Sequence, residues 1–169
     1  GLGDAAINTV WMAAAVVLLT VPVAFLYAYA VQRAVIPLKG LWRLVGLSAL
    51  LGPSLVGAVA FIQWFGNQGL LKPVMGDVSI YGPLGIILGT SFAAFPHALM
   101  ILLVSLAGAD GRLYEAARAL GASRWKIFRT VTLPSAKYGL VSACMVVFAY
   151  SVSEFGVPKV IGGNFKVLA

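Results

Sequence analysis

Four long apolar segments alternate with short polar connections along this chain, at about residues 7–31, 44–65, 83–107 and 133–152. Each has the length, roughly 20 residues or more, that an α-helix needs to cross a hydrocarbon core of about 30 Å. The strands of a membrane barrel would instead appear as segments of roughly ten residues with alternating polarity. The pattern therefore predicts an all-α, polytopic bundle that crosses a membrane about four times.

Prolines and glycines predict where these segments bend or end. Pro53 lies inside the second segment, where it removes a backbone hydrogen bond and is expected to kink or break the helix. Turn-forming residues dominate 66–82, so we expect an irregular connection there. Residues 33–43 are predicted to form a short basic loop, and residues 153–169 to be too interrupted for a regular helix.

The composition excludes a water-soluble globular domain. Of the 169 residues, 61% are hydrophobic and 10% are charged, with a mean hydropathy of +0.98, whereas soluble domains carry about 25% charged residues. Cys144 and His97 are each the sole residue of their type, which excludes an intrachain disulfide and a metal site built from cysteines or clustered histidines. We do not expect the first apolar segment to be a signal peptide, because it is too long for one and no basic stretch precedes it in the given sequence.

The net charge of +7 is concentrated in two alternate connections, which argues against nucleic acid as a partner. Basic residues gather in 33–43 and in 108–132, whereas 66–82 contains one lysine and one aspartate. Lysine and arginine are enriched in the cytoplasmic loops of membrane proteins. We therefore expect 33–43 and 108–132 to be cytoplasmic, and residue 1 and the 66–82 connection to lie outside.

The basic segment 108–132 has the pattern of two short helices joined by a turn. Leu113, Ala116, Ala117 and Leu120 share one narrow helical face, and the small alanines would allow another surface to approach closely. Gly121 then permits a left-handed turn at the end of the helix. From these residues alone, the helix could lie on anionic lipid or could dock onto a soluble partner.

The flanking residues support the same arrangement. Glu115 and Arg118 stand three positions apart and can pair on the first helix. Ser123 is a suitable N-cap for a second helix that reaches about Thr130. Pro134 suits the first turn of the following apolar helix, where its missing N–H costs little.

The spacing of residues across this segment resembles the signature cytoplasmic loop of type I ABC importer permeases, the binding-protein-dependent inner-membrane components. The matching positions are Glu115, Ala116, Ala117, Gly121, Val131, Leu133 and Pro134, and isoleucine is more frequent in the family where Val131 stands. The resemblance extends to Asn8 in the first apolar segment, to the proline in the second and to Glu154-Phe155-Gly156 after the fourth.

The resemblance implies a permease fold and a mechanism. The loop would form a coupling helix that docks onto a cytoplasmic ATPase subunit, through Glu115, Ala116, Ala117 and Gly121, with Leu133 and Pro134 setting the angle between loop and helix. Two ATPase subunits, which bind ATP and magnesium, would drive two permease subunits or halves, and a periplasmic solute-binding protein would deliver the substrate. We expect a bacterial inner-membrane protein, with one domain over 1–169 that is incomplete at its C-terminal end.

The chain itself has no predicted catalytic, cofactor-binding or metal-binding residues. It lacks a glycine-rich phosphate loop of the Walker type, so ATP hydrolysis would belong to the partner subunit. No serine–histidine or paired-carboxylate arrangement indicates catalysis. The rival hypothesis is a non-transport membrane protein, either an anchor or an intramembrane enzyme, with an interfacial amphipathic helix.

The segment after the fourth apolar helix contains the candidates for the translocation path or gate, Glu154, Phe155 and Gly156. A carboxylate near a membrane segment is costly and often functional. The alternative is a solvated Glu154 that pairs with Lys159 at the membrane interface. We also expect His97 to bond a backbone carbonyl freed by Pro96, rather than to relay protons.

The substrate prediction rests on resemblance alone. Residues 154–158 and 161–163 look like the permease branch that serves ferric iron, polyamines, thiamine and phosphonates such as 2-aminoethylphosphonate. Within that branch the sequence favours a phosphonate or ferric iron. The positive charge gives no support for an anionic substrate, because most of it is expected on the cytoplasmic side.

Overall fold

The computed structural model describes residues 2–33, 37–51, 54–71, 73 and 80–162, and every regular element in that part of the chain is helical. The principal helices in chain order are α1 (Leu2–Arg33), α2 (Lys39–Leu47), α3 (Ser54–Phe65), α5 (Pro83–Ala107), α6 (Gly111–Ala119), α7 (Arg124–Ile127), α8 (Leu133–Ser153) and α9 (Gly156–Ile161). A 3₁₀ turn, η1 (Ser48–Leu51), follows α2, and a π-helical stretch, η2 (Phe128–Thr132), joins α7 to α8. The all-α prediction is confirmed.

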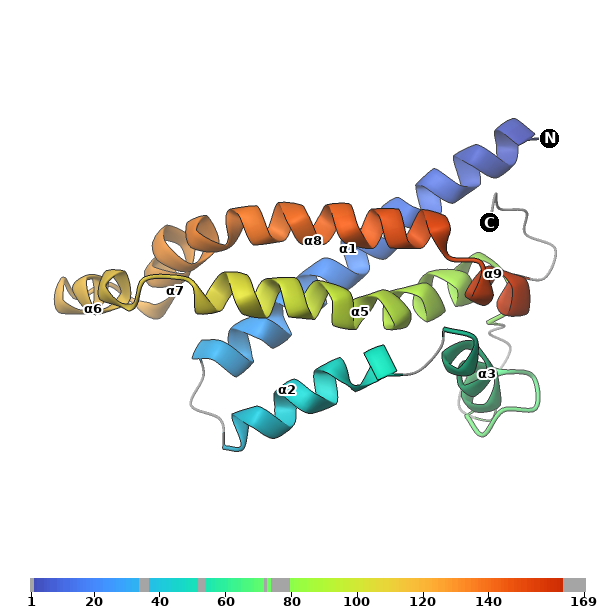
Figure 1. Ribbon diagram of the computed structural model, residues 1–169, viewed down its shortest axis with the longest axis horizontal. Helices are drawn as coiled ribbons and strands as arrows, with labels where there is room; N and C mark the ends of the chain where they lie inside the picture. Colours follow the sequence, from blue (N-terminus) through green and yellow to red (C-terminus); the bar gives the residue numbers. More distant parts are fainter. Residues whose placement is uncertain (1, 34–36, 52–53, 72, 74–79, 163–169) are drawn as a thin grey trace.

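Three long helices, α1, α5 and α8, form the body of the molecule and pack against one another along much of their length (Figure 1). Within the described residues, three helical stretches are long and apolar enough to span a membrane: Gly3–Arg33, Pro83–Ala107 and Arg124–Ser153. Their shared core contains Ala24, Ala98, Leu102 and Val147, all of which are fully buried. Many of their other large apolar side chains are exposed, as expected for surfaces that meet lipid or further helices.

Small residues bring α5 and α8 into close contact. Ala136, Gly139 and Ala143 recur along one face of α8 and are buried. A methyl group added at Gly139 would overlap the Ser105 side chain of α5. Because lipid tails are as apolar as leucine, membrane helices associate largely through such close packing of small residues.

The second apolar segment is not one continuous α-helix in the part of the chain that the structure describes, and the kink or break predicted at Pro53 lies outside the described residues. The segment begins earlier than expected, with α2 at Lys39, and changes into the 3₁₀ turn η1 before α3. Helix α3, with 12 residues, is shorter than a membrane span. In place of four similar spans, the described residues therefore contain three long helices and one interrupted segment.

Three boundaries differ from the prediction. Helix α1 begins at Leu2, so that Asp4 lies in its first turn. The basic stretch 33–43 is mostly helical, because α1 continues to Arg33 and α2 starts at Lys39, while residues 34–36 lie outside the described part. The stretch after the fourth span is not wholly irregular, since α9 occupies Gly156–Ile161; Gly163 is not among the described residues.

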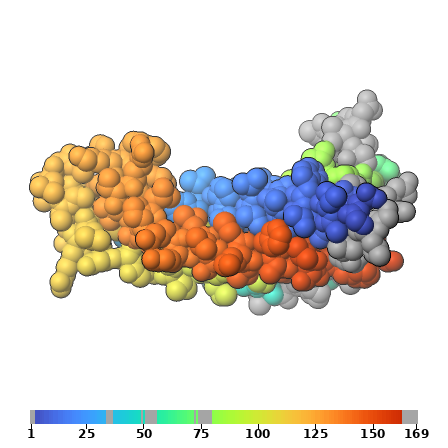
Figure 2. Space-filling model, turned by 90° about the horizontal axis from the view of Figure 1, so that it is seen from above, coloured from blue at the N-terminus to red at the C-terminus, as the bar shows by residue number. Residues whose placement is uncertain are grey.

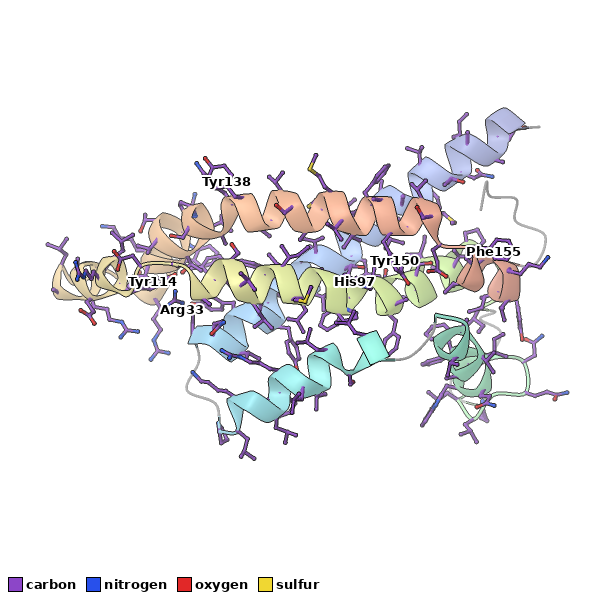
Figure 3. All side chains as sticks on the ribbon, in the orientation of Figure 1. Arg33, His97, Tyr114, Tyr138, Tyr150 and Phe155 are labelled. Carbon is purple, nitrogen blue, oxygen red and sulfur yellow. The ribbon has the colours of Figure 1, made fainter. Side chains whose placement is uncertain are left out.

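The two basic connections lie at the same end of the bundle. Helices α6 and α7 lie beyond the C-terminal end of α5, close to the end of α1 where Arg33 lies, and the start of α2 is nearby (Figures 1 and 3). The N-terminus and α9 lie at the opposite end (Figure 1). Figure 2 shows α1 and α8 side by side across one face, with the α6–α7 segment at one end of it.

Candidate functional site: the α6–α7 segment

The α6–α7 segment is shaped by local capping interactions that its sequence predicts. The Asp110 side chain accepts a hydrogen bond from the Arg112 backbone N–H at 2.9 Å at the start of α6. Gly121 has φ +71°, in the left-handed region that favours glycine. Ser123 then caps α7, where its hydroxyl accepts from the Lys126 backbone N–H at 3.3 Å. The two short helices and the turn between them are therefore observed.

The predicted apolar face of α6 is not buried within the described chain. Leu113 is 52% exposed and Leu120 is 87% exposed, and Ala116 between them is exposed as well. Ala117 is half-buried, whereas Glu115 is exposed. A nine-residue helix therefore presents an apolar strip at one end of the molecule, with small residues in its middle.

Tyr114, which the sequence analysis did not select, is the one buried residue of α6. Its hydroxyl and that of Thr132, which is fully buried in η2, are hydrogen-bonded at 3.1 Å. The guanidinium carbon of Arg33, at the end of α1, lies 3.9 Å from the centre of the Tyr114 ring. Figure 3 shows Arg33 and Tyr114 side by side at this end of the bundle.

A cavity of about 1040 Å³ lies between the end of α1 and the α6–α7 segment. Three arginines line it, Arg33, Arg118 and Arg124, together with Glu115. Glu115 and Arg118 both border this space, but among the described residues no ion pair joins them, so the pairing expected from their spacing is not observed. Within the same part of the chain, no group of acidic, histidine or cysteine side chains is arranged to hold a metal ion.

Leu133 and Pro134 lie where the α6–α7 segment runs into the long helix α8. Pro134 is in the first turn of α8, as predicted. The five residues before α8 form the π-helical stretch η2 (Phe128–Thr132), so the chain runs as one helix from Arg124 to Ser153 with a change of pitch inside it. Single π-helical turns of this kind occur often at functional positions.

At the opposite end, Glu154 is buried rather than solvated, with 7% of its surface exposed. One carboxylate oxygen accepts hydrogen bonds from the backbone N–H groups of Gly156 at 2.9 Å and Val157 at 3.3 Å. Lys159 lies instead over the ring of Phe155, at 5.9 Å from its centre. The prediction of a solvated Glu154–Lys159 pair is therefore wrong. The Glu154 carboxylate instead accepts hydrogen bonds from the first backbone N–H groups of α9.

His97 does not show the expected hydrogen bond to a carbonyl. Its Nδ1 atom is buried without a partner, and its ring lies 5.0 Å from that of Tyr150 on α8 (Figure 3). His97 therefore packs against an aromatic ring of a neighbouring helix and does not hydrogen-bond the carbonyl freed by Pro96.

Comparison with known protein families decides the kind of protein. A family model described as "Binding-protein-dependent transport system inner membrane component" matches residues 6–168. The chain belongs to this family. The match covers nearly all of the chain, including the α6–α7 segment and Glu154.

Relatives in this family are named as permease proteins. The chain is 30% identical over 145 residues to the Molybdenum transport system permease protein ModB of Escherichia coli K12, covering 83% of this chain and 63% of ModB. It is 27% identical over 168 residues to the Sulfate transport system permease protein CysW of the same strain, covering 95% of this chain and 57% of CysW. The chain thus spans about three fifths of the length of these curated relatives.

The names of these relatives do not support the expected substrate branch. They refer to molybdenum and sulfate transport, whereas residues 154–158 and 161–163 suggested ferric iron, polyamines, thiamine or phosphonates.

Proposed function

We propose that this chain is the permease subunit of an ATP-driven, binding-protein-dependent importer in the bacterial inner membrane. The observation that carries the proposal is the exposed apolar strip of α6, at the basic end of a bundle of long apolar helices. Such a strip is costly in water, and exposed apolar patches mark interaction sites. Family membership, together with the permease names of the relatives, supports this reading over a simple membrane anchor.

The partner at the strip is inferred to be a cytoplasmic ATPase subunit, which would bind the ATP and magnesium. Glu115, Ala116, Ala117 and Gly121 supply the docking surface, and Leu133 and Pro134 join it to α8. A second permease subunit or half, and a periplasmic solute-binding protein, complete the proposed importer. Glu154, Phe155 and Gly156 lie at the other end, where the translocation path or gate would open to the outside.

Substitution of Ala116 with tryptophan tests the docking role. The side chain is exposed, so Ala116→Trp adds bulk outside the fold and only a docked partner would be displaced. We expect the variant to lose the ATPase that co-purifies with the unmodified protein, and to lose uptake. Leu44→Trp, at an exposed position of α2, is the matched control and should retain both. If Ala116→Trp instead reduces binding to anionic vesicles and leaves uptake intact, the interfacial-helix hypothesis is favoured.

For the substrate, we infer a tetrahedral oxyanion. Sulfate is one, and molybdenum in oxygenated water is present as the tetrahedral molybdate ion, so one chemistry links the two relatives. A phosphonate shares the tetrahedral anionic head and remains a competitor, whereas ferric iron does not. Uptake of labelled sulfate and molybdate, with excess 2-aminoethylphosphonate or ferric citrate as competitors, separates these classes. Absence of sulfate and molybdate uptake by a transporter that takes up labelled ferric citrate would contradict the inference.

A further inference from the structure

We propose that Tyr114 is a positioning residue that connects the α6 docking helix to three spanning helices at once. The proposal rests on the proposed function, because it assigns the route by which a movement of α6 reaches the membrane-spanning part. Tyr114 is buried in the middle of α6, between the exposed apolar strip and the ends of the long helices. It is the only buried residue of a helix that lies wholly within the described chain.

The first connection runs to α1 and α5 through Arg33. The Arg33 guanidinium lies against the Tyr114 ring at 3.9 Å, in a cation–π contact. The same guanidinium donates to the Leu106 backbone carbonyl at 3.1 Å. Leu106 is in the last turn of α5, where carbonyls have no partner within their own helix. One side chain from α1 therefore contacts both the docking helix and the end of α5.

The neighbouring Gln32 strengthens the same junction. Its side-chain amide donates to the Leu103 carbonyl of α5 at 3.0 Å, and its oxygen accepts from Arg43 of α2 at 2.8 Å. The end of α1 is thereby fixed to α5 and to α2 next to the point where Arg33 meets Tyr114. A displacement of Tyr114 would therefore be passed to the end of α1 and, through it, to α5 and α2.

The second connection runs to α8 through Thr132. The Tyr114 and Thr132 hydroxyls are 3.1 Å apart in a buried hydrogen bond, and Thr132 is the last residue of η2. A buried bond of this kind is costly to break, because the remaining hydroxyl finds no water. The π-helical stretch η2 lies directly between α7 and α8. Tyr114 therefore forms a hydrogen bond with the helix at the point where its pitch changes.

The rest of α6 gives little alternative contact with the spanning helices. Its apolar strip points away from the chain, and Arg118 and Glu115 border the cavity of about 1040 Å³ rather than a packed surface. A push on the strip therefore reaches α1, α5 and α8 through Tyr114 or through the short connections at 108–110 and 120–123. If Tyr114 is the main route, weakening it uncouples ATP hydrolysis from transport without removing the ATPase.

The experiment measures substrate transported per ATP hydrolysed by the assembled transporter in liposomes, with its ATPase and binding protein. Tyr114→Leu removes both connections and should lower this ratio about tenfold, the scale of coupling carried by a single network position. Tyr138→Leu is the matched control. Tyr138 also has a cation over its ring, Lys137 at 4.7 Å, but it is 74% exposed on α8 and should leave the ratio unchanged.

Two milder variants isolate the hydroxyl bond. Tyr114→Phe keeps the ring beneath Arg33, and Thr132→Val keeps the shape of the threonine. Each should lower the ratio about threefold, and the double variant should be no worse than either alone, because both remove one interaction. These variants carry the test if Tyr114→Leu fails to assemble.

The outcomes separate this proposal from the proposed function. A ratio equal to that of the unmodified transporter in Tyr114→Leu, or in both milder variants, overturns the role of Tyr114. Independent losses that add in the double variant overturn the hydrogen-bonded route. If the unmodified protein binds no ATPase at all, the proposed function itself fails.

Discussion

Glu154 is a buried carboxylate that accepts hydrogen bonds from the backbone near one end of the bundle. Its oxygen accepts from two N–H groups that begin α9, and these groups have no other partner inside a short helix. The positive end of the helix and the two donors compensate the buried charge. The residue thus positions α9, which packs through Val157 and Ile161 against Ala58 of α3.

We predict that Glu154→Gln is well tolerated and Glu154→Leu is not. Glutamine retains an oxygen that can accept the same bonds, whereas leucine leaves two buried N–H groups unpaired at a cost of about 1–3 kcal/mol each. Thermal unfolding in detergent measures the difference, which should appear as a lower melting temperature for the leucine variant alone. Loss of uptake in Glu154→Gln with unchanged stability would show instead that the negative charge itself acts in the path.

Gly121 holds the turn between α6 and α7 by its backbone conformation, not by lack of space. A methyl group at this position would meet nothing within 4 Å, yet φ is +71°. A side chain in that conformation costs roughly 1–2 kcal/mol, and asparagine tolerates it better than alanine.

ATPase retention and uptake should therefore be highest for the wild type, lower for Gly121→Asn and lowest for Gly121→Ala. Quantitative co-purification with the ATPase measures it. Gly40→Ala is a suitable control, because Gly40 lies in helix α2 and also has open space around it. If Gly121→Ala retained as much ATPase as the wild type, the left-handed turn would be dispensable for docking.

Among the helices, the contact between α5 and α8 depends on the absence of a side chain at one position. Gly139 lies directly against Ser105, and Ala136 and Ala143 continue the same narrow surface. A larger residue there forces the two helices apart or into strained rotamers, which typically costs about 1–3 kcal/mol.

We predict that Gly139→Leu lowers the thermal stability of the purified protein and reduces the amount recovered from membranes. Met145→Leu, at a position of the same helix that is 69% exposed, should change neither. Fluorescence-detected size exclusion after heating compares the two variants. Equal melting temperatures for the variants would show that α5 and α8 do not meet closely at Gly139.

Local sequence signals predicted those elements whose determinants are close together in the chain. The long helices follow from apolar length, and the α6–α7 turn follows from Gly121 and Ser123. The π-helical pitch of η2 has no comparable signal, because residues 128–132 satisfy an ordinary helical pattern. In the second segment, neither the earlier start at Lys39 nor the turn η1 had a local signal in the sequence.

The site was predictable in its exposed half and not in its buried half. The apolar strip of α6 lies on the expected face because helical periodicity is a local property. Tyr114 falls outside that face, and its partners Arg33 and Thr132 are distant in sequence. Only the packed bundle brings an arginine from the end of α1 to the ring, so no pattern within residues 108–132 could identify the contact.

The whole molecule has a polar asymmetry that predicts its orientation in the membrane. Both basic connections lie at one end of the bundle, where the exposed side chains of α6 and α7 also lie (Figure 1). The connection that follows α3, residues 66–82, contains only one lysine and one aspartate. Positive residues are retained on the cytoplasmic side during insertion. The end that bears α6 should therefore be cytoplasmic, which is where an ATPase could reach it.

Cysteine labelling in intact spheroplasts measures this orientation. The chain has one natural cysteine, Cys144, which is half-buried on α8 and can be replaced by alanine. In that background, a membrane-impermeant maleimide should label Asn67→Cys in intact spheroplasts, and should label Lys126→Cys only after the membrane is opened. Both native side chains are exposed, so access to each position depends on the membrane and not on burial. The reverse labelling pattern would place α6 outside, beyond the reach of ATP, and would contradict both the orientation and the docking of a cytoplasmic ATPase.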